Sequence, residues 1–294
     1  MRVLIVKLSS LGDVVHTLAA LHALKKGLGA DVKIDWLVEE PSAGMLNSHP
    51  MLDEVVVVRK TSLLRSPFKS LAIAKRLASK RYDMVLDFQG LLKSGVWVFL
   101  SRAKRRIGFS GSREFSSIFL NESLPPYDPD MHAVARYLLL AEYVGVDIKE
   151  VLFPIHIPDE AKGRAQRLLL EQGITHGESF ICAVPSARWP TKLWSEKEFA
   201  RLIRLINKRT GFKSVLVGST ADMEMAERIK GCCEGSAVSL AGNTGLKELA
   251  YILGLGVFTV SVDSGPMHVA AAVGSRVVSL FGPTAPWRTG PYGE

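Results

Sequence analysis

One carboxylate, Asp13, stands where a strand is expected to give way to a helix. The strand-like run 3–8 leads into the segment 7–16 (KLSSLGDVVH), in which Gly12 lets the backbone turn closely before the carboxylate. Asp at the start of a helix commonly caps it, which is the plainer interpretation. A carboxylate at the carboxyl edge of a strand can also take a proton from a substrate hydroxyl. We predict that Asp13 is a general base, with a helix cap as the alternative.

Two loops in the second half combine the features of a phosphate site. In segment 261–268 (SVDSGPMH) a strand ends and a helix begins, and the free N–H groups and positive end of that helix attract an anion beside His268. In segment 185–194 (PSARWPTKLW), Lys192 offers a point charge to a phosphate. The alternatives are helix caps for the first loop and a surface loop held by Trp194 for the second.

The remaining polar segments are weaker candidates. Segment 281–293 (FGPTAPWRTGPYG) follows a strand and contains too many Gly and Pro for a regular element, so we expect it to line the mouth of a ligand site. Residues 128–130 (DPD) match the D-x-D of metal-dependent glycosyl transfer, but their proline-rich surroundings favour a turn. No dinucleotide-binding or P-loop glycine motif is present, which argues against a dehydrogenase and a P-loop ATPase. We expect no metal and no cofactor.

Short apolar strands alternate with helical patterns in both halves of the chain. We expect strands near residues 3–8, 33–38, 54–58, 83–88, 105–109, 179–184, 213–217, 257–262 and 276–281. We expect helices near residues 13–28, 66–80, 90–101, 132–145, 159–172, 195–209, 221–231, 246–253 and 265–273. This alternation predicts an α/β protein with two Rossmann-like, doubly wound parallel-sheet domains facing a cleft, and ligands beyond the carboxyl ends of the strands.

Length and composition agree with two domains. The chain has 294 residues, and prolines at 154 and 158 interrupt regular structure, so we divide it into domains 1–150 and 151–294. No apolar run is long enough to span a membrane, and the run 3–6 is too short for a signal-peptide core. Three cysteines cannot make a disulfide framework. We expect a cytoplasmic protein.

Positive charge is concentrated in one segment. The chain carries a net charge of +8, yet residues 59–113 contain fourteen Lys or Arg and only two Asp. Such a segment usually faces an anion, such as nucleic acid, phospholipid or a phosphorylated or carboxylated substrate, although solvated helix faces are an equal alternative. Nucleic acid is disfavoured, because the aromatic residues of the segment occupy core-like positions.

Five segments in register carry a resemblance that covers essentially the whole chain. They are 7–18 (KLSSLGDVVHTL), 87–94 (DFQGLLKS), 186–194 (SARWPTKLW), 262–272 (VDSGPMHVAAA) and 281–293. Together they resemble the lipopolysaccharide heptosyltransferases of glycosyltransferase family 9, which have the GT-B fold. The opening SSLGDVVHT and the SRE at 112–114 are most similar to the first heptosyltransferase.

The resemblance implies an inverting, metal-independent transfer of L-glycero-D-manno-heptose from ADP-heptose to the Kdo sugar of the lipopolysaccharide inner core. It implies that Asp13 is the base and that 151–294 is the donor domain. The donor-binding residues would be Ser186, Lys192, Asp222, Asp263, Ser264, Gly265 and His268. Domain 1–150 would bind the acceptor through Ser10, Gly12, Lys60, Arg65 and Arg113. Another GT-B nucleotide-sugar transferase or an epimerase remains the alternative.

The resemblance also implies where the protein works. Kdo-lipid A is a lipid-linked acceptor, so we expect peripheral contact with the inner face of a Gram-negative inner membrane. Such proteins continue into a further helix after the motif at 281–293, so the second domain is expected to be truncated at its end.

Overall fold

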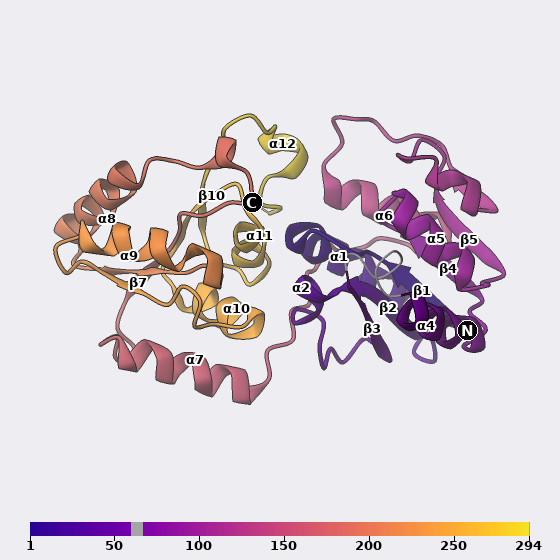
Figure 1. The fold of residues 1–294 in the computed structure, drawn as a ribbon, viewed down its shortest axis with the longest axis horizontal. Coiled ribbons are helices and arrows are strands. Elements are labelled where there is room, and N and C mark those ends of the chain that lie inside the picture. Colours follow the sequence, from indigo (N-terminus) through magenta and orange to yellow (C-terminus); the bar gives the residue numbers. More distant parts are fainter. Residues whose placement is uncertain (60–66, 294) are drawn as a thin grey trace. The chain divides into compact units, whose positions relative to one another are not determined.

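The computed structural model describes residues 1–59 and 67–293, which form two compact units, Met1–Pro154 and Ile155–Glu294 (Figure 1). Each unit is built on one parallel sheet with helices on both of its faces. The predicted domain boundary, after residue 150, lies in the irregular segment 146–158 between α6 (Ala133–Tyr143) and α7 (Asp159–Glu171).

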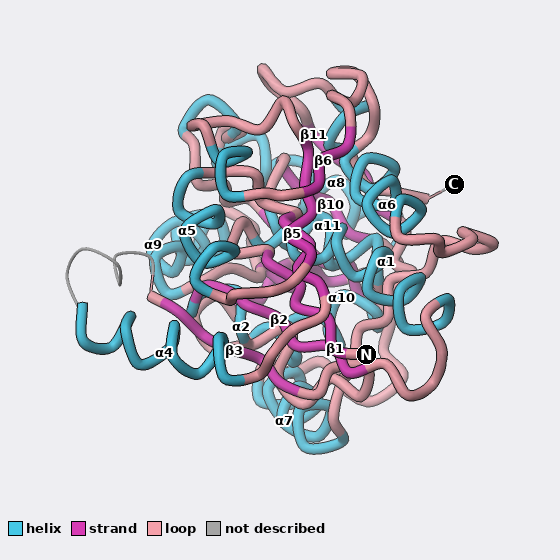
Figure 2. Tube along the Cα trace, turned by 90° about the vertical axis from the view of Figure 1, so that its right-hand side faces the viewer, coloured by secondary structure: helices cyan, strands magenta, loops and turns pink. Residues whose placement is uncertain are grey.

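The first unit is a six-stranded sheet. Its elements are β1 (Arg2–Val6), α1 (Leu11–Gly27), β2 (Lys33–Glu39), α2 (Glu40–Ala43), β3 (Glu54–Val58), α4 (Pro67–Ser79), β4 (Met84–Asp87), α5 (Leu92–Leu100), β5 (Arg105–Phe109), the 3-10 turn η1 (Ser116–Phe119), β6 (Glu122–Leu124) and α6. The strand order is β3-β2-β1-β4-β5-β6, and all pairs are parallel. In Figure 2 the strands run between α4 and α5 on one side and α1 and α6 on the other.

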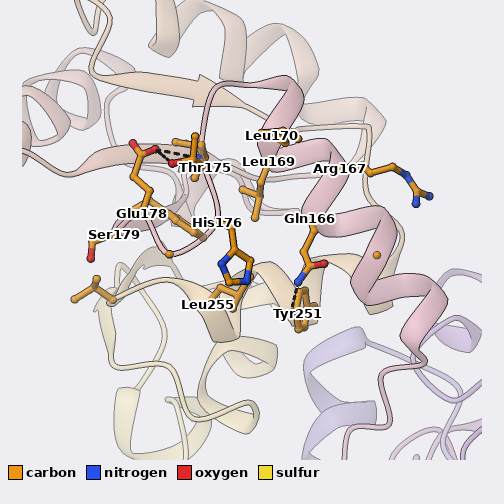
Figure 3. Close-up of a pocket in the computed structure, with 15 residues that line it drawn as sticks. Gln166, Arg167, Leu169, Leu170, Thr175, His176, Glu178, Ser179, Tyr251 and Leu255 are labelled. Atoms are coloured by element: carbon orange, nitrogen blue, oxygen red, sulfur yellow. Dashed lines mark hydrogen bonds between the residues drawn. The ribbon is translucent and has the colours of Figure 1, made fainter.

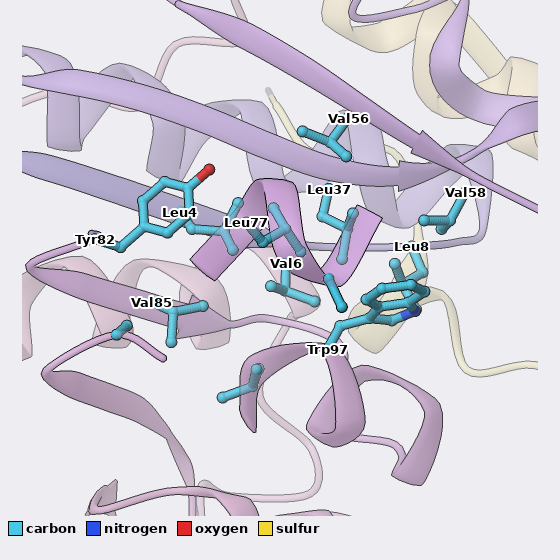
Figure 4. Packing of buried hydrophobic residues seen from close by; sticks show 13 residues of the cluster. Leu4, Val6, Leu8, Leu37, Val56, Val58, Leu77, Tyr82, Val85 and Trp97 are labelled. Carbon is cyan, nitrogen blue, oxygen red and sulfur yellow. The ribbon is translucent and has the colours of Figure 1, made fainter. Parts of the chain in front are cut away.

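Both faces of the central strand β1 are buried, which explains its continuous apolar run. Leu4 and Val6 join Val85 of β4 and Trp97 of α5 in one core cluster (Figure 4). Successive side chains of a strand point to opposite faces, and Ile5 is equally inaccessible on the other side. A strand covered on both sides leaves its carboxyl end as the place where polar residues can gather.

The second unit is a five-stranded sheet. Its elements are α7, β7 (Phe180–Val184), η2 (Pro190–Lys192), α8 (Glu196–Thr210), β8 (Lys213–Leu216), η3 (Thr220–Asp222), α9 (Met223–Gly231), β9 (Ala237–Ser239), α10 (Leu246–Leu255), β10 (Thr259–Val262), α11 (Gly265–Ala272), β11 (Val277–Leu280) and α12 (Pro286–Thr289). The strand order is β11-β10-β7-β8-β9, again parallel throughout. Ile181 and Ala183 pack with Phe199 of α8 in a core cluster, whereas Cys182 contacts α10 on the opposite face.

The predicted α/β class with two parallel sheets is confirmed, and every predicted strand and helix is present. The short elements α2, β6, β9 and α12 and the 3-10 turns η1 and η2 were not predicted, because three or four residues are too few to show periodicity. The prediction that 281–293 contains no regular element was wrong. The turn α12 starts at Pro286, where the fixed φ of proline suits the first position of a helix. Among the described residues, no helix is both long and apolar enough to cross a bilayer.

Candidate active site

The register of β1 and β4 brings the first predicted loop beside the segment that follows β4. Val6 lies opposite Asp87, so the residues after each strand leave the sheet at the same edge. The side-chain oxygen of Gln89 accepts hydrogen bonds from the backbone N–H groups of Leu8 (3.1 Å) and Ser9 (3.0 Å). Buried Asp87 in turn accepts one from the Gln89 N–H (3.0 Å). The DFQG segment therefore holds the β1–α1 loop in place.

Asp13 lies in the first turn of α1, and the N-cap is Ser10 rather than Asp13 itself. Its Oδ2 accepts hydrogen bonds from the Ser10 N–H (3.1 Å) and Oγ (2.9 Å). Its Oδ1 accepts one from the Tyr137 hydroxyl (2.8 Å). The Asp13 side chain is still 35% exposed. The carboxylate thus organises the start of the helix and remains accessible to a ligand, so the two interpretations of Asp13 do not exclude each other.

Lys7 and Tyr137, which were not predicted as site residues, contact Asp13 from the protein interior. The Lys7 ammonium donates to the Tyr137 hydroxyl (2.7 Å) and to the Phe88 carbonyl (3.1 Å), and it lies 3.7 Å from Asp13 Oδ1. Both side chains are almost inaccessible to solvent. Lys7, Tyr137 and Asp13 therefore form a closed triangle of a cation, a hydroxyl and a carboxylate.

Electrostatics in this triangle favour the ionised form of Asp13. Burial alone would raise the pKa of the carboxyl, but the charge of Lys7 and the hydrogen bonds from Tyr137 and Ser10 outweigh it, and the pKa lies well below its ordinary value. Burial lowers the pKa of Lys7, against the attraction of Asp13. Burial, followed by the charge of Asp13, raises the pKa of Tyr137, so this hydroxyl keeps its proton.

A cavity of about 250 Å³ opens beside these residues. Its walls include Asp13 together with two arginines, Arg113 and Arg136, that come from distant parts of the chain. Arg113 is anchored by a hydrogen bond from its backbone N–H to the Gly90 carbonyl (3.1 Å). The Arg136 guanidinium lies over the ring of Tyr127 at 4.7 Å. The structure thus brings Asp13 and Arg113 together as predicted for one site, and adds Arg136.

Six of the fourteen basic residues in segment 59–113 form ion pairs within the protein. Carboxylates from outside the segment pair with Arg59, Arg76, Lys80, Lys93 and Arg105. One of the segment's own aspartates pairs with Lys104. Its formal charge therefore overstates the charge available to a ligand. Among the described basic residues of the segment, Arg113 is the one that lines the cavity. Lys60 and Arg65 lie outside the described residues.

Three of the predicted loops converge in the second unit. Val262 pairs with Leu280 at the ends of β10 and β11, so segments 261–268 and 281–293 leave the sheet together. A Cβ on Gly282 would lie 2.7 Å from the Thr191 carbonyl oxygen, so only glycine lets the loop 185–194 approach this closely.

The centre of this convergence is an ion pair. Lys192 Nζ lies 2.6 Å from Oδ2 of Asp263, whose side chain is 5% exposed, and Thr284 Oγ1 donates to the same oxygen. Ser264 is the N-cap of α11, which begins at Gly265. His268 is buried in this helix, and Ser186 is buried at the end of β7. A cation and a helix N-terminus therefore lie at the carboxyl edge of this sheet, where an anion is stabilised.

The other predicted residues have local structural contacts. Asp222 accepts hydrogen bonds from the Ser219 N–H and Oγ, both at 2.7 Å, at the start of η3. Gly12 is buried within α1. Ser195 is the N-cap of α8, although its side chain makes no capping hydrogen bond. The predicted turn at 128–130 is confirmed by a hydrogen bond from the Asp130 N–H to the Asp128 carboxylate (2.9 Å).

Another cavity of the second unit, of about 630 Å³, lies away from these loops (Figure 3). It is lined by α7, the following loop and the end of α10, including Leu170, His176 and Tyr251. Its lining also includes Phe180, the first residue of β7, and so it lies at the amino ends of the strands. Ligands of parallel sheets bind at the opposite, carboxyl edge, so volume alone does not identify the site.

Comparison with known proteins shows the family of this chain. The family model described as glycosyltransferase family 9 (heptosyltransferase) matches residues 70–294. The chain belongs to glycosyltransferase family 9. It is therefore a glycosyltransferase. The region matched by the family model includes segments 186–194, 262–272 and 281–293 of this family 9 chain.

Curated relatives of this family 9 chain point to the lipopolysaccharide core. Lipopolysaccharide heptosyltransferase 1 of Escherichia coli K12 is 32% identical, over 100% of this chain and 92% of that protein. Lipopolysaccharide heptosyltransferase 1 of Pseudomonas aeruginosa is 31% identical, over 100% of this chain and 82% of that protein. The chain is thus a heptosyltransferase I-like glycosyltransferase of the lipopolysaccharide core.

Solved structures agree in fold. The E. coli heptosyltransferase WaaC, solved with ADP, superposes with a TM-score of 0.82 at 30% identity, covering 100% of this chain and 91% of that one. A WaaC structure with ADP-2-deoxy-2-fluoro heptose gives a TM-score of 0.80. The family 9 glycosyl transferase of Veillonella parvula superposes with a TM-score of 0.90 at 26% identity, covering 99% of this chain and 83% of that one. The GT-B fold predicted for this family 9 chain is therefore confirmed.

Proposed function

We propose that this enzyme transfers L-glycero-D-manno-heptose from ADP-heptose to Kdo of the lipopolysaccharide inner core, with inversion at the anomeric carbon and without a metal. The observation that carries the proposal is the accessible, ionised carboxylate of Asp13 in a cavity shared with Arg113 and Arg136. A base for a sugar hydroxyl and cations for an acid sugar are what a Kdo acceptor requires. The donor is supported by the ligands of the related WaaC structures, ADP and a fluorinated ADP-heptose.

In the proposed reaction, Asp13 accepts the proton of the acceptor hydroxyl as the hydroxyl oxygen attacks the anomeric carbon of the donor. The new bond between oxygen and carbon forms as the bond from that carbon to the diphosphate oxygen breaks. The electron pair of the broken bond leaves with ADP. Attack from the side opposite the leaving group inverts the anomeric carbon, and no covalent enzyme intermediate forms. Asp13 ends the step protonated and returns its proton to solvent.

In the second unit, we propose that the loops around Lys192 hold the diphosphate. Lys192 supplies a point charge, the N-terminus of α11 supplies the positive end of the helix dipole, and His268 stands in the first turn of the same helix. These groups would stabilise the negative charge that develops on ADP as it leaves. We also propose that Ser186 and Asp222 contact the donor, with Asp222 toward the ribose.

We further propose that the acceptor is lipid-linked and that the first unit contacts the inner face of the inner membrane. Three of the exposed large apolar side chains of the first unit are Phe99 in the last turn of α5, Phe115 just before η1, and Ile118 within η1. Arg102, which follows α5, is exposed as well. Apolar side chains beside cations are typical of segments that rest on anionic lipid.

Heptose transfer to a deacylated Kdo-lipid A tests the function directly. We expect ADP release and a heptosylated product with ADP-heptose as donor, and a much slower reaction with UDP-glucose or GDP-mannose. The rate is expected to persist in excess EDTA, because Lys192 and the α11 N-terminus supply the charge. The anomeric configuration of the product, read by NMR, checks inversion. Equal use of another nucleotide sugar would reject the proposed donor.

Arg113→Lys is expected to raise the acceptor KM about tenfold and to leave the donor KM unchanged. A guanidinium can hold a carboxylate with two parallel hydrogen bonds, and losing one of them costs about 1.4 kcal/mol, a factor of ten. Arg81→Lys is the matched control, because exposed Arg81 belongs to the same basic segment but does not line the cavity. If both KM values move together in Arg113→Lys, the assignment of this cavity to the acceptor is wrong.

A further inference from the structure

Lys7, directly after β1, has an ammonium that is removed from water, and the burial of a charge requires a physical explanation. The Lys7 side chain is 4% exposed, and among the described residues its ammonium lies close to the Tyr137 hydroxyl, the Phe88 carbonyl and Asp13 Oδ1. Burying an ammonium costs free energy unless a partner pairs with it. If this position served packing alone, an apolar residue would therefore be more stable there. Lys7 therefore has a task that involves one of these neighbours.

The neighbour with a chemical function is Asp13. Lys7 Nζ lies 3.7 Å from Asp13 Oδ1, and the Tyr137 hydroxyl bridges them, accepting from Lys7 at 2.7 Å and donating to Oδ1 at 2.8 Å. Asp13 is about one third exposed, whereas Lys7 and Tyr137 are almost inaccessible. An acceptor sugar can thus reach the carboxylate but not the two groups that hold it.

We infer that Lys7 and Tyr137 are positioning residues for the proposed base: they keep the Asp13 carboxylate ionised and fixed in one orientation. The inference rests on the proposed function, since it assigns a task to residues that act through Asp13. The Tyr137 hydroxyl sets the direction of one carboxylate oxygen, and Ser10 sets the other. Lys7 supplies the charge that balances the carboxylate in a site partly removed from water.

Other charged groups around the carboxylate do not replace Lys7. From α6, Arg136 lies over the Tyr137 ring at 5.0 Å, and His132 stands at the N-terminus of that helix. From α1, His16 follows Asp13 by one turn. Arg113 and Tyr127 face the same cavity from loops, and Asp87 brings a second buried carboxyl beside Lys7. Lys7 is the cation within ion-pair distance of Asp13 among the described residues.

The test measures the Asp13 carboxyl itself, by its carbon-13 NMR signal against pH, assigned by its loss in Asp13→Asn. Lys7→Met keeps the length and apolar stem of the side chain and removes the charge. Without the cation, burial dominates, and the pKa of Asp13 is expected to rise by about one to three units, the shift typical of losing a close opposite charge. The inflection of the carboxyl signal therefore moves up toward the ordinary range of an aspartate, about pH 4. The acid limb of kcat/KM should move upward with it, because activity falls as pH falls through the pKa of the base.

Two further variants keep the test decisive. Tyr137→Phe removes only the bridging hydroxyl, and it is expected to shift the carboxyl pKa in the same direction by a smaller amount. Lys247→Met is the matched control, since Lys247 is also buried and donates to a backbone carbonyl, that of His156, at 2.6 Å. It should not move the Asp13 signal.

The outcomes separate the inference from the function on which it rests. An unchanged Asp13 pKa in both Lys7→Met and Tyr137→Phe overturns the inference. If the carboxyl pKa rises while the acid limb of kcat/KM does not move, Lys7 does hold the carboxylate and Asp13 is not the base.

Discussion

Asp13→Asn is expected to lower kcat by about 10² to 10⁴, the usual contribution of a positioned general base. Asparagine has the same shape: its oxygen can accept from the Ser10 N–H, and its amide nitrogen can donate to the Tyr137 hydroxyl, so the start of α1 should remain intact. The charge, and with it the ability to take a proton, is lost. Initial rates at saturating donor and acceptor, with a melting curve of the variant, measure the effect.

The matched control is Glu178→Gln. Glu178 accepts hydrogen bonds from the Thr175 N–H (2.9 Å) and Oγ1 (3.1 Å), as Asp13 does from Ser10, but it lies in the loop after α7. Both substitutions remove one charge from the same kind of local contact. Near-normal turnover of a folded Asp13→Asn protein, equal to that of the control, would leave Asp13 as a helix residue only.

The sequence was sufficient to predict the site's polar loops, since they follow strands whose apolar runs are unmistakable. Asp13 and Arg113 could be assigned to one site in advance only through the resemblance. Their meeting in one cavity depends on the parallel register of β1 and β4 and on the contact between Arg113 and Gly90. Periodicity predicts that strands exist but not which neighbours they pair with.

Lys7, Arg136 and Tyr137 were missed for identifiable reasons. A lysine that ends an apolar strand is normally solvated, and nothing in segment 7–16 reveals that a tyrosine 130 residues away covers it. Helix α6 has the pattern of an ordinary amphipathic helix, and which of its polar side chains meets the sheet edge depends on how it packs against α1. The one signal in the sequence was Lys7 itself, a charged residue within the strand-like run 3–8.

The basic segment remains a prediction as an acceptor site, but less of its charge is free than its sequence indicates. Its excess of positive charge was counted along the chain, whereas Glu39, Glu40, Glu54 and Glu122, which neutralise much of it, lie before or after it in sequence. Net charge of a segment therefore predicts an anion site only where tertiary structure leaves its side chains unpaired. At this site, the positive charge that we expect to meet a ligand comes from the arginines that line the cavity, Arg113 and Arg136.

Lys192→Met is expected to lower kcat/KM for the donor by about 10² to 10³, as does removal of one group that stabilises developing negative charge. Lys192 lies at the carboxyl edge of the second sheet, where it forms an ion pair with Asp263 beside the α11 N-terminus. Calorimetric titration with ADP and steady-state kinetics measure the loss. The same substitution also leaves the buried Asp263 without its cation, and breaking such a pair costs about 3 kcal/mol.

The double variant Lys192→Met/Asp263→Asn separates these two effects. Neutralising both partners removes the uncompensated charge, and the oxygen of the introduced amide can still accept from the Thr284 hydroxyl that now donates to Asp263, so the melting temperature is expected to recover most of its loss. Donor binding is expected to stay weak, because no positive charge returns to the loop. If ADP affinity recovers together with the melting temperature, the only task of Lys192 is to neutralise Asp263, and the diphosphate must be held by α11 and His268 instead.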